Sequence, residues 1–237
     1  MDNFTYIIAD EQGFKNDYID GLLAAGYYRM QHFMFTCNDT ALDEEGRTIP
    51  VFWLRTLVKQ CRLTTSARTI LNKGAAFSVI IQPARVDEEI EQLYAMYKIH
   101  VPFSVSASCA DYLHQPLLSQ PFTSMMVQVR HEEKLIAAGY FDAGSRSIAG
   151  IMNIYHPHYR SYSLGKLLLL KKLQYASEND MQFYYTGYIS PQSTRFDYKT
   201  FPDPAAVELL LPDKLQWVPY PQVSKEFLTD YYLKYLV

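Results

Sequence analysis

"TSMMVQVRHEEKLIAAGYFDAGSRSIAGIMNIYHPHYRSYSLGKLLLLKKLQYASENDMQFYYTGY", residues 123–188, decides the fold of this chain. It opens with three strand-like runs, TSMMVQVR, LIAAGYF and IAGIMNIY, and the turn-rich HEEK and DAGSRS between them predict an antiparallel meander. A helix is predicted from about Leu164 to Ser177, and the apolar run MQFYYTGY follows it as a strand. A strand, a turn, a helix and a second strand in this order predict a crossover to a parallel neighbour.

The segments on either side add further helices and strands. A short helix is predicted over residues 14–25, and strands are predicted over QHFMFT, VFWLR and AFSVIIQPAR. VDEEIEQLYAMYKIH has apolar residues at helical spacing and acidic residues in its first turn, and Ser108 is a candidate N-cap of a shorter helix. FDYKTFPDP and LQWVPY are expected as short strands or loops, and SKEFLTDYYLKYL as a closing helix. The chain is therefore expected to be an α+β protein.

The composition indicates a folded protein with a substantial core. The chain has 237 residues, of which 49% are hydrophobic, and no run approaches the roughly 18 apolar residues that a membrane span needs. The acidic start MDNFTYIIADEQ lacks the basic and apolar regions of a signal peptide. Cys37, Cys61 and Cys109 are widely spaced without a C-x-x-C pair, which is typical of free thiols in a reducing compartment. We expect a cytoplasmic protein without a membrane segment or a metal site.

The formal net charge of -3 conceals an uneven distribution. Residues 46–86 contain seven basic residues and no acidic one, and a second acid-free stretch, residues 143–177, contains five more. Two basic segments on an acidic body suit an anionic ligand that touches one face, such as a phosphorylated cofactor or the end of an RNA. Two solvated faces are the alternative. The candidate RNA contacts in the first segment are Arg55, Arg62, Arg68 and Lys73.

The stretch HPHYRSYSLGK, residues 156–166, begins like a phosphate-binding turn. The residues at positions 160 and 167 break the ATP-loop pattern G-x-x-x-x-G-K-[ST], so nucleotide hydrolysis is set aside. Residues 160–165 instead resemble R-x-x-G-x-G, the acyl-carrier turn of the GCN5-related acyltransferases, with Ser163 in place of the first glycine. In that fold the backbone N–H groups of the turn and of the helix N-terminus hold a phosphate. A loop that leads into a buried crossover helix is the alternative.

Several motifs in one order resemble a narrower family, the aminoacyl-tRNA-protein transferases that add Arg or Leu to protein N-termini. The S-L-G helix start of that family is similar to residues 163–165, and the aromatic-D-P turn before it is similar to residues 155–157. Its Y-L-G-Y strand end resembles residues 185–188, and its Y-K element resembles Tyr198-Lys199. Upstream, GYYRMQHFMFTC resembles the G-[FWY]-x-R start, CRLTTSARTILNK the basic segment, and LYAMY the helix motif L-Y-x-x-Y.

The chain also departs from the family's pattern. The C-x-x-C cysteines near the N-terminus are reduced to Cys37, and His156 replaces the acid of the aromatic-D-P turn. The R-S-Q-R-R core of the basic segment is thinned to residues 66–69, and the Arg of a late F-R-P element is missing. Because phosphate contacts supply much of the affinity for RNA, the thinned segment predicts fewer contacts to tRNA.

The resemblance implies the fold, the activity and the partners. It implies a GCN5-related N-acyltransferase-like mixed sheet flanked by helices, with an N-terminal basic α+β subdomain over residues 1–85 and an acyltransferase-like domain over 86–237, or one continuous unit. The implied reaction moves an aminoacyl group from charged tRNA to the N-terminal α-amine of a protein, with aminoacyl-tRNA as co-substrate and no further cofactor. An acyl-CoA-dependent N-acyltransferase of the same fold and an inactive module that binds peptide N-termini are the alternatives.

Such an enzyme needs no nucleophile of its own, because the attacking amine comes from the substrate. It has to hold amine and ester together, deprotonate an ammonium with a pKa of about 8, and stabilise the oxyanion. The catalytic candidates are His156, Asp197 and Tyr188. The donor-binding candidates are Arg160, Ser163, Leu164, Gly165 and Lys166. The substrate-binding candidates are Tyr155, Tyr185, Gly187, Tyr198 and Lys199. Lys199 is expected to meet an acidic acceptor residue, and an aromatic core contact is the alternative for each tyrosine.

Overall fold

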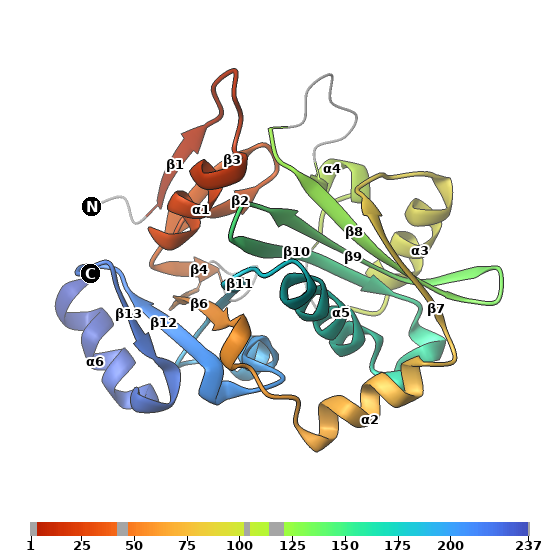
Figure 1. Ribbon diagram of the computed structural model, residues 1–237. Helices are drawn as coiled ribbons and strands as arrows, with labels where there is room; N and C mark the ends of the chain where they lie inside the picture. The colour runs from red at the N-terminus through yellow and green to blue at the C-terminus, as the bar shows by residue number, and fades with distance from the viewer. Residues whose placement is uncertain (1–3, 42–46, 102–104, 114–120, 237) are drawn as a thin grey trace.

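A large mixed sheet runs through the molecule (Figure 1). The computed structural model describes residues 4–41, 47–101, 105–113 and 121–236. The strands of this sheet are β6 (Phe52–Leu57), β7 (Ser78–Pro83), β8 (Ser124–His131), β9 (Lys134–Ala143), β10 (Ser147–Tyr155), β11 (Phe183–Ile189), β12 (Val207–Leu211) and β13 (Gln216–Pro219). They lie in the order β13-β12-β6-β11-β10-β9-β8-β7.

The predicted meander and crossover are both present. Strand β8 pairs antiparallel with β9, and β9 pairs antiparallel with β10. The chain then forms the helix α5 (Leu164–Glu178) and returns as β11, which pairs parallel with β10. On its other side β11 pairs antiparallel with β6, which comes from far upstream in the chain. The predicted fold class, an α+β protein with a mixed sheet flanked by helices, is therefore confirmed.

Helices cover both faces of the sheet, because successive apolar side chains along a strand point to opposite faces. On β8, Val127 and Val129 pack toward α5 and α2 (Thr65–Gly74), while Met126 packs toward α3 (Glu88–Lys98) and α4 (Cys109–Leu113). In Figure 1, α5 lies in front of the sheet and α2 lies below it. Ser108 Oγ accepts a hydrogen bond from the backbone N–H of Asp111, which confirms Ser108 as the N-cap of α4.

The N-terminal residues build a smaller layer that packs against the central strands of this sheet. The three-stranded sheet β1-β3-β2 consists of β1 (Phe4–Ile8), β2 (Tyr28–Met30) and β3 (Phe33–Cys37), and α1 (Asn16–Ala24) lies beside it. A hairpin of β4 (Asp39–Ala41) and β5 (Thr48–Pro50) leads into β6. The boundary that we expect at residue 85 stays a prediction, although β6 and β7, which lie before it, belong to the large sheet.

The C-terminal part differs from the sequence-based expectation in two places. FDYKTFPDP forms no strand, because residues 194–200 are a 3-10 helix, η3 (Thr194–Thr200). Strand β12 was not expected, and it pairs with both β6 and β13. The closing helix α6 (Lys225–Tyr235) is present and covers a cluster that includes Leu209 and Tyr231.

Four further short 3-10 helices connect these elements. They are η1 (Val58–Gln60), η2 (Pro157–Tyr162), η4 (Pro204–Ala206) and η5 (Tyr220–Gln222). Within the part of the chain that the structure describes, no helix is long and apolar enough to cross a membrane.

Candidate functional site

The turn before α5 has the conformation that the acyl-carrier motif requires. Ser163, which stands in place of the motif's first glycine, has φ 53° and ψ 47°, a left-handed conformation that glycine adopts at little cost. Its carbonyl accepts hydrogen bonds from the N–H groups of Lys166 and Leu167, so the helix begins at Leu164 as predicted. At Gly165, a Cβ atom would lie 3.2 Å from a ring carbon of Tyr155, which shows how closely the turn approaches the end of β10.

Strands β10 and β11 separate soon after they begin to pair. Three residue pairs join them, from Ser147–Phe183 to Ala149–Tyr185, and both strands then show irregular register with their outer neighbours. The hydroxyl oxygen of Tyr28 lies 2.7 Å from the carbonyl oxygens of both Gly150 and Tyr185. A side chain from the N-terminal sheet therefore occupies the point where the two strands diverge.

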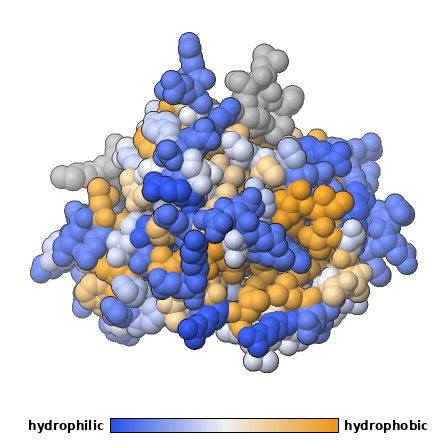
Figure 2. All heavy atoms as spheres, in the orientation of Figure 1, coloured by the Kyte–Doolittle hydropathy of each residue, from blue (hydrophilic) through white to orange (hydrophobic). Residues whose placement is uncertain are grey.

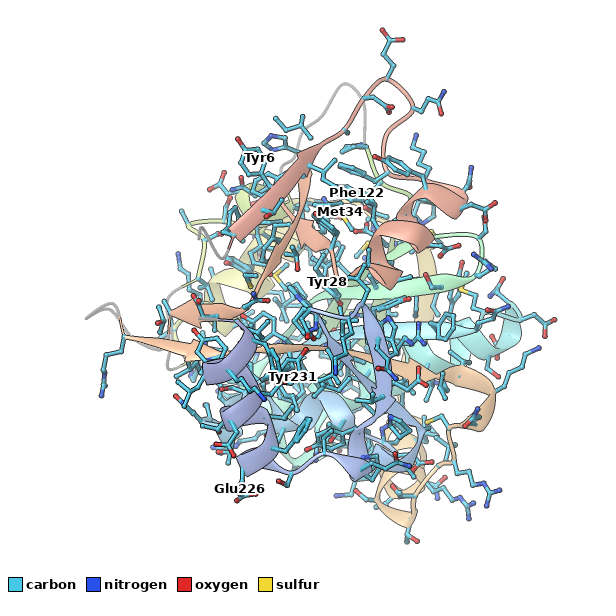
Figure 3. All side chains as sticks on the ribbon, turned by 90° about the vertical axis from the view of Figure 1, so that its left-hand side faces the viewer. Tyr6, Tyr28, Met34, Phe122, Glu226 and Tyr231 are labelled. Carbon is cyan, nitrogen blue, oxygen red and sulfur yellow. The ribbon has the colours of Figure 1, made fainter. Side chains whose placement is uncertain are left out.

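Tyr28 is held in place by an aromatic cluster. Its ring stacks on Trp53 with 5.0 Å between the centroids and 15° between the planes, and Trp53 also contacts Phe35 and Tyr188. Burial raises the pKa of Tyr28, so the hydroxyl keeps its proton and can donate it to a carbonyl. Figure 3 shows Tyr28 where the N-terminal sheet meets the large sheet, with Tyr6 at the outer edge.

The structure brings three of the four predicted site tyrosines together. The surroundings of Tyr198 raise its pKa to about 12, first through loss of hydration and then through the nearby phenols of Tyr112, Tyr188 and Tyr155, although 47% of Tyr198 is exposed. Tyr155 also contacts Tyr97 of α3, with 5.2 Å between the ring centroids. Tyr97 and Tyr112 were missing from the predicted site, since nothing in the sequence places α3 and α4 beside η3.

The fourth tyrosine, Tyr185, lies elsewhere. Its ring contacts Trp217 and Phe183 in the cluster under the N-terminal sheet. Tyr184 packs on the opposite face of β11, and Tyr188 packs against the same cluster as Tyr185 because the register shifts between Tyr185 and Gly187. The carbonyl of Tyr185, however, is one of the two that Tyr28 contacts. The ring contacts of Tyr185 among the described residues are with Phe183 and Trp217 and with none of the other site tyrosines. Its role in substrate binding stays a prediction.

The predicted catalytic residues have different surroundings. His156 is buried, its Nε2 lies 3.0 Å from Lys134 Nζ, and its Nδ1 accepts the N–H of His158 at 3.3 Å. Burial and the charge of Lys134 lower the pKa of His156. Its ring thus caps η2, as the family's acid in this turn would do.

The other two candidates lie on η3 and β11. Asp197 Oδ2 lies 3.8 Å from Lys225 Nζ of α6. Tyr188 has a long hydrogen bond of 3.4 Å to Thr40, and burial raises its pKa. The catalytic roles of His156, Asp197 and Tyr188 stay predictions.

Lys199 lies at Gly187, the glycine of the Y-x-G-Y strand end. Gly187 has a φ of +107°, a backbone angle that residues other than glycine rarely adopt. A Cβ at this position would lie 2.7 Å from Lys199 Nζ. The ammonium position is 4.3 Å from the centroid of the Tyr188 ring and 5.0 Å from that of Phe196. Gly187 and Lys199, both predicted site residues, are therefore in direct contact.

The two acid-free segments meet at the turn. Lys73 Nζ at the end of α2 lies 3.4 Å from the carbonyl oxygen of Ser161 in η2, and Gly74 packs against Leu167 of α5. Arg62, Arg68 and Lys73 are exposed, as are Arg160 and Lys166 of the second segment. In Figure 2, hydrophilic residues cover the lower edge of this face, where α2 lies in Figure 1.

Arg55 differs from the other predicted RNA contacts. Its Nε donates to Glu208 at 2.7 Å, and its guanidinium lies over the rings of Phe183 and Trp217. Only 14% of its side chain is exposed. Because its charge is already paired, we leave Arg55 out of the exposed basic surface and keep Arg62, Arg68 and Lys73 in it.

A buried ion pair joins the N-terminal sheet to the large sheet. Arg29 of β2 binds Asp142 of β9 at 2.9 Å, and the two side chains are 2% and 0% exposed. Arg29 also donates to Ser124 and to the carbonyl of Leu113. Lys172 of α5 is buried nearby, donates to the carbonyl of Tyr140 at 2.7 Å, and has its pKa lowered by burial to about 7. The G-Y-Y-R motif is the sequence signal that marks both Tyr28 and Arg29.

The cysteines are free thiols in surroundings that disfavour reaction. Burial raises the pKa of Cys37, Cys61 and Cys109 to about 12. Across residues 4–41, 47–101, 105–113 and 121–236, no group of three or more His, Cys, Asp or Glu side chains is placed to hold a metal ion.

Comparison with known proteins identifies the family. The model of the arginine-tRNA-protein transferase, C terminus, matches residues 89–208. The chain belongs to this family. The matched residues run from α3 to β12 and include the turn at Ser163, the divergence of β10 and β11, and Lys199. Tyr28, Arg29 and the basic helix α2 precede the part that the arginine-tRNA-protein transferase model covers.

Two relatives agree with the family match. The chain is 32% identical over 164 residues to arginyl-tRNA–protein transferase 1 of Arabidopsis thaliana, with 60% of this chain and 26% of that protein covered. It is 24% identical over 205 residues to the aspartate/glutamate leucyltransferase of Helicobacter hepaticus, with 81% of this chain and 80% of that protein covered. The chain thus spans about a quarter of the plant relative and four-fifths of the bacterial one.

Two solved structures are similar to this chain at TM-scores below 0.5. The crystal structure of FemX has a TM-score of 0.47 at 8% identity and covers 81% of this chain and 65% of that chain. A tandem GNAT protein from the clavulanic acid biosynthesis pathway has a TM-score of 0.41 at 12% identity and covers 92% of this chain and 60% of that chain.

Proposed function

We propose that this protein transfers an aminoacyl group from charged tRNA to the N-terminal α-amine of a protein. The observation that carries the proposal is the match of residues 89–208 to the arginine-tRNA-protein transferase family. The names of the two relatives, an arginyl-tRNA–protein transferase and an aspartate/glutamate leucyltransferase, support the same reaction class. Aminoacyl-tRNA is the co-substrate, and the reaction requires no further cofactor.

The donor would bind at the N-terminus of α5. The first N–H groups of a helix have no partner within the helix and attract phosphate, and the left-handed Ser163 turns the chain so that these groups begin at Leu164. Arg160 and Lys166 are exposed beside this turn, and Lys73 of α2 reaches it. Phosphates of the tRNA acceptor end would contact these cations, and the aminoacyl ester would lie beyond Tyr28, toward the unpaired ends of β10 and β11.

The acceptor amine would bind among the tyrosines. Tyr155, Tyr188 and Tyr198 come together with Tyr97 and Tyr112, as the mutual effects on their pKa values indicate. Aromatic faces attract an ammonium ion, which favours its binding. Loss of hydration between the rings favours loss of its proton. The same rings can stack with the terminal base of the tRNA, since stacking contributes about 1–3 kcal/mol per base.

A transfer assay tests this function. The protein is incubated with tRNA charged with Arg or Leu and with peptides that begin with Asp, Glu, Arg or Lys, and the peptide mass is measured. We expect a mass increase of one aminoacyl residue that requires a free α-amine, so uncharged tRNA and N-acetylated peptides are the controls. No transfer with any pair of donor and acceptor would contradict the proposal. Transfer from acyl-CoA, or peptide binding without transfer, would favour one of the two alternatives instead.

A further inference from the structure

The amine of Lys199 lies in an unusual environment for a lysine. Its side chain runs along Gly187, where a Cβ would lie 2.7 Å from Nζ and 3.3 Å from Cε. The rings of Tyr188 and Phe196 lie on its other sides. Among the described residues, no hydrogen bond or ion pair involves this amine, which is half-buried. A glycine backbone and two aromatic rings therefore surround the Lys199 amine.

The surroundings favour a neutral amine. Loss of hydration and the positive charge of Arg195 lower the pKa of Lys199 to about 7. The aromatic rings attract the charged form, by about 0.5–2 kcal/mol, and offset only part of this effect. Near neutral pH a large fraction of Lys199 is therefore unprotonated and has a free lone pair.

We propose that Lys199 accepts the proton of the acceptor's α-ammonium, an inference that rests on the function proposed above. One ammonium N–H bond breaks and its proton moves to Lys199 Nζ. The freed lone pair attacks the carbonyl carbon of the aminoacyl ester, and a C–N bond forms. The ester C–O bond then breaks, and the leaving ribose oxygen takes the remaining surplus proton of the attacking nitrogen. Lys199 finally releases its proton to solvent, which leaves an amide and a free ribose hydroxyl.

The other candidate bases are less suited to this step. Both ring nitrogens of His156 already face partners, Lys134 and the N–H of His158. Asp197 lies within 3.8 Å of the ammonium of Lys225. Tyr188 and Tyr198 have raised pKa values, so at neutral pH they hold their protons and cannot accept another. Lys199 is the base in this group that lies in direct contact with both Gly187 of the Y-x-G-Y strand end and the ring of Tyr188.

Three variants of Lys199 separate its roles in a transfer assay. Lys199→Met removes the amine, and Lys199→Arg keeps a positive charge that does not titrate. We expect both to reduce kcat/KM at least about 100-fold and to lose the limb of the pH profile near 7. Alkylation of Lys199→Cys with bromoethylamine rebuilds an amine and is expected to restore both. The wild-type protein treated in the same way is the matched control, because its own thiols have pKa values of about 12.

The outcomes that overturn the inference are distinct from failure of the proposed function. If Lys199→Arg transfers at the wild-type rate with the wild-type pH profile, Lys199 supplies charge and accepts no proton. The ¹⁵N signal of the Lys199 amine reports its protonation without depending on activity. If this amine titrates near pH 10 in a wild-type protein that does transfer aminoacyl groups, the inference about Lys199 is wrong while the proposed function stands. No transfer by the wild-type protein with any donor would remove the proposed function, and this inference with it.

Discussion

Tyr28 has one hydroxyl proton and two carbonyl neighbours at equal distance. In a continued parallel ladder these two carbonyls would accept from backbone N–H groups, so the single hydroxyl stands in for ladder bonds at the divergence of β10 and β11. The site also depends on the backbone conformation of Ser163 and Gly187, two residues at its edges that both have positive φ. The site thus depends on a few backbone positions that local side-chain chemistry alone would not reveal.

Replacement of Tyr28 by Phe is expected to destabilise the protein. The variant removes the one donor that the carbonyls of Gly150 and Tyr185 share, which lowers the free energy of unfolding by about 1–3 kcal/mol. Urea unfolding measures this change. Tyr6→Phe is the matched control, because Tyr6 is 57% exposed and the loss of its hydroxyl is expected to change stability by less than about 0.5 kcal/mol. Equal stability of Tyr28→Phe and the wild type would show that the hydroxyl does not hold the strands.

Replacement of Gly165 by Ala is expected to weaken donor binding and to preserve the fold. The added Cβ lies 3.2 Å from the Tyr155 ring, so the ring or the turn must shift by a few tenths of an ångström. We expect a raised KM for charged tRNA and a thermal midpoint within a few degrees of the wild type. The control is Gly21→Ala in α1, where the space around the new Cβ is open within 4 Å and donor KM is expected to stay constant. An unchanged KM for Gly165→Ala would mean that the turn is only structural.

At the scale of elements, the Arg29–Asp142 pair connects β2 to β9 and, through Leu113, to α4. The two side chains are almost completely shielded from water, so the pair gains hydrogen bonds at Asp142 Oδ1 but loses hydration on both sides. Because burial raises the pKa of Asp142 while Arg29 lowers it, the carboxylate depends on the guanidinium to stay charged. This ion pair therefore ties the N-terminal sheet to the large sheet, in addition to the contacts of Tyr28 with β10 and β11.

Replacement of Arg29 by Met is expected to cost about 3–5 kcal/mol of unfolding free energy, because it leaves Asp142 buried without its partner. Denaturant unfolding measures the cost, and the double variant with Asp142→Asn is expected to recover part of it. Arg85→Met serves as the control, since the Arg85–Asp87 pair is largely exposed and is expected to contribute at most about 1 kcal/mol. A similar cost for Arg29→Met and Arg85→Met would contradict this account.

The elements differed in how well the sequence predicted them. The meander, α3 and α5 follow from local periodicity and capping residues, and the Ser163 turn follows from its motif. Strand β12 and the pairing of β6 with β11 were not predicted, because partners far apart in the chain leave no local pattern. The same reason explains why the contacts of Lys199 were not predicted, since only the folded chain places it between Gly187 and two aromatic rings. That Lys199 meets an acidic acceptor residue stays a prediction.

At the scale of the whole molecule, charge is arranged so that acid-free segments from distant parts of the chain share one face. Lys73 and Ser161 make the contact between them, and Lys166 lies over the ring of Phe201 close to the same turn. The rest of the chain carries the acidic residues, and the net charge is therefore -3. Such an arrangement can attract an RNA phosphate backbone to one face of an acidic protein.

The stability of the whole protein is expected to depend on pH through Lys199. In the folded protein its pKa is about 7, whereas in the unfolded chain it is about 10.4. Between these values the unfolded chain binds one more proton, so the free energy of unfolding rises with pH. Lys199→Met lacks this contribution. The difference in stability between wild type and variant should be constant below pH 7 and rise from pH 7 to 10, as denaturant unfolding at each pH can measure. A constant difference throughout would mean that Lys199 titrates normally.

The position of β11 in the sheet has a consequence for the order of folding. Strand β11 pairs with β10, its near neighbour in sequence, and with β6, where Leu57 meets Phe183. On a ribosome, residues 52–57 emerge long before residues 183–189, so β6 has no partner on that side until β11 is complete. Non-local pairings of this kind slow folding. The N-terminal sheet and Tyr28 can therefore take their final place only after the crossover has closed, which makes formation of the candidate site a late event in the life of each new chain.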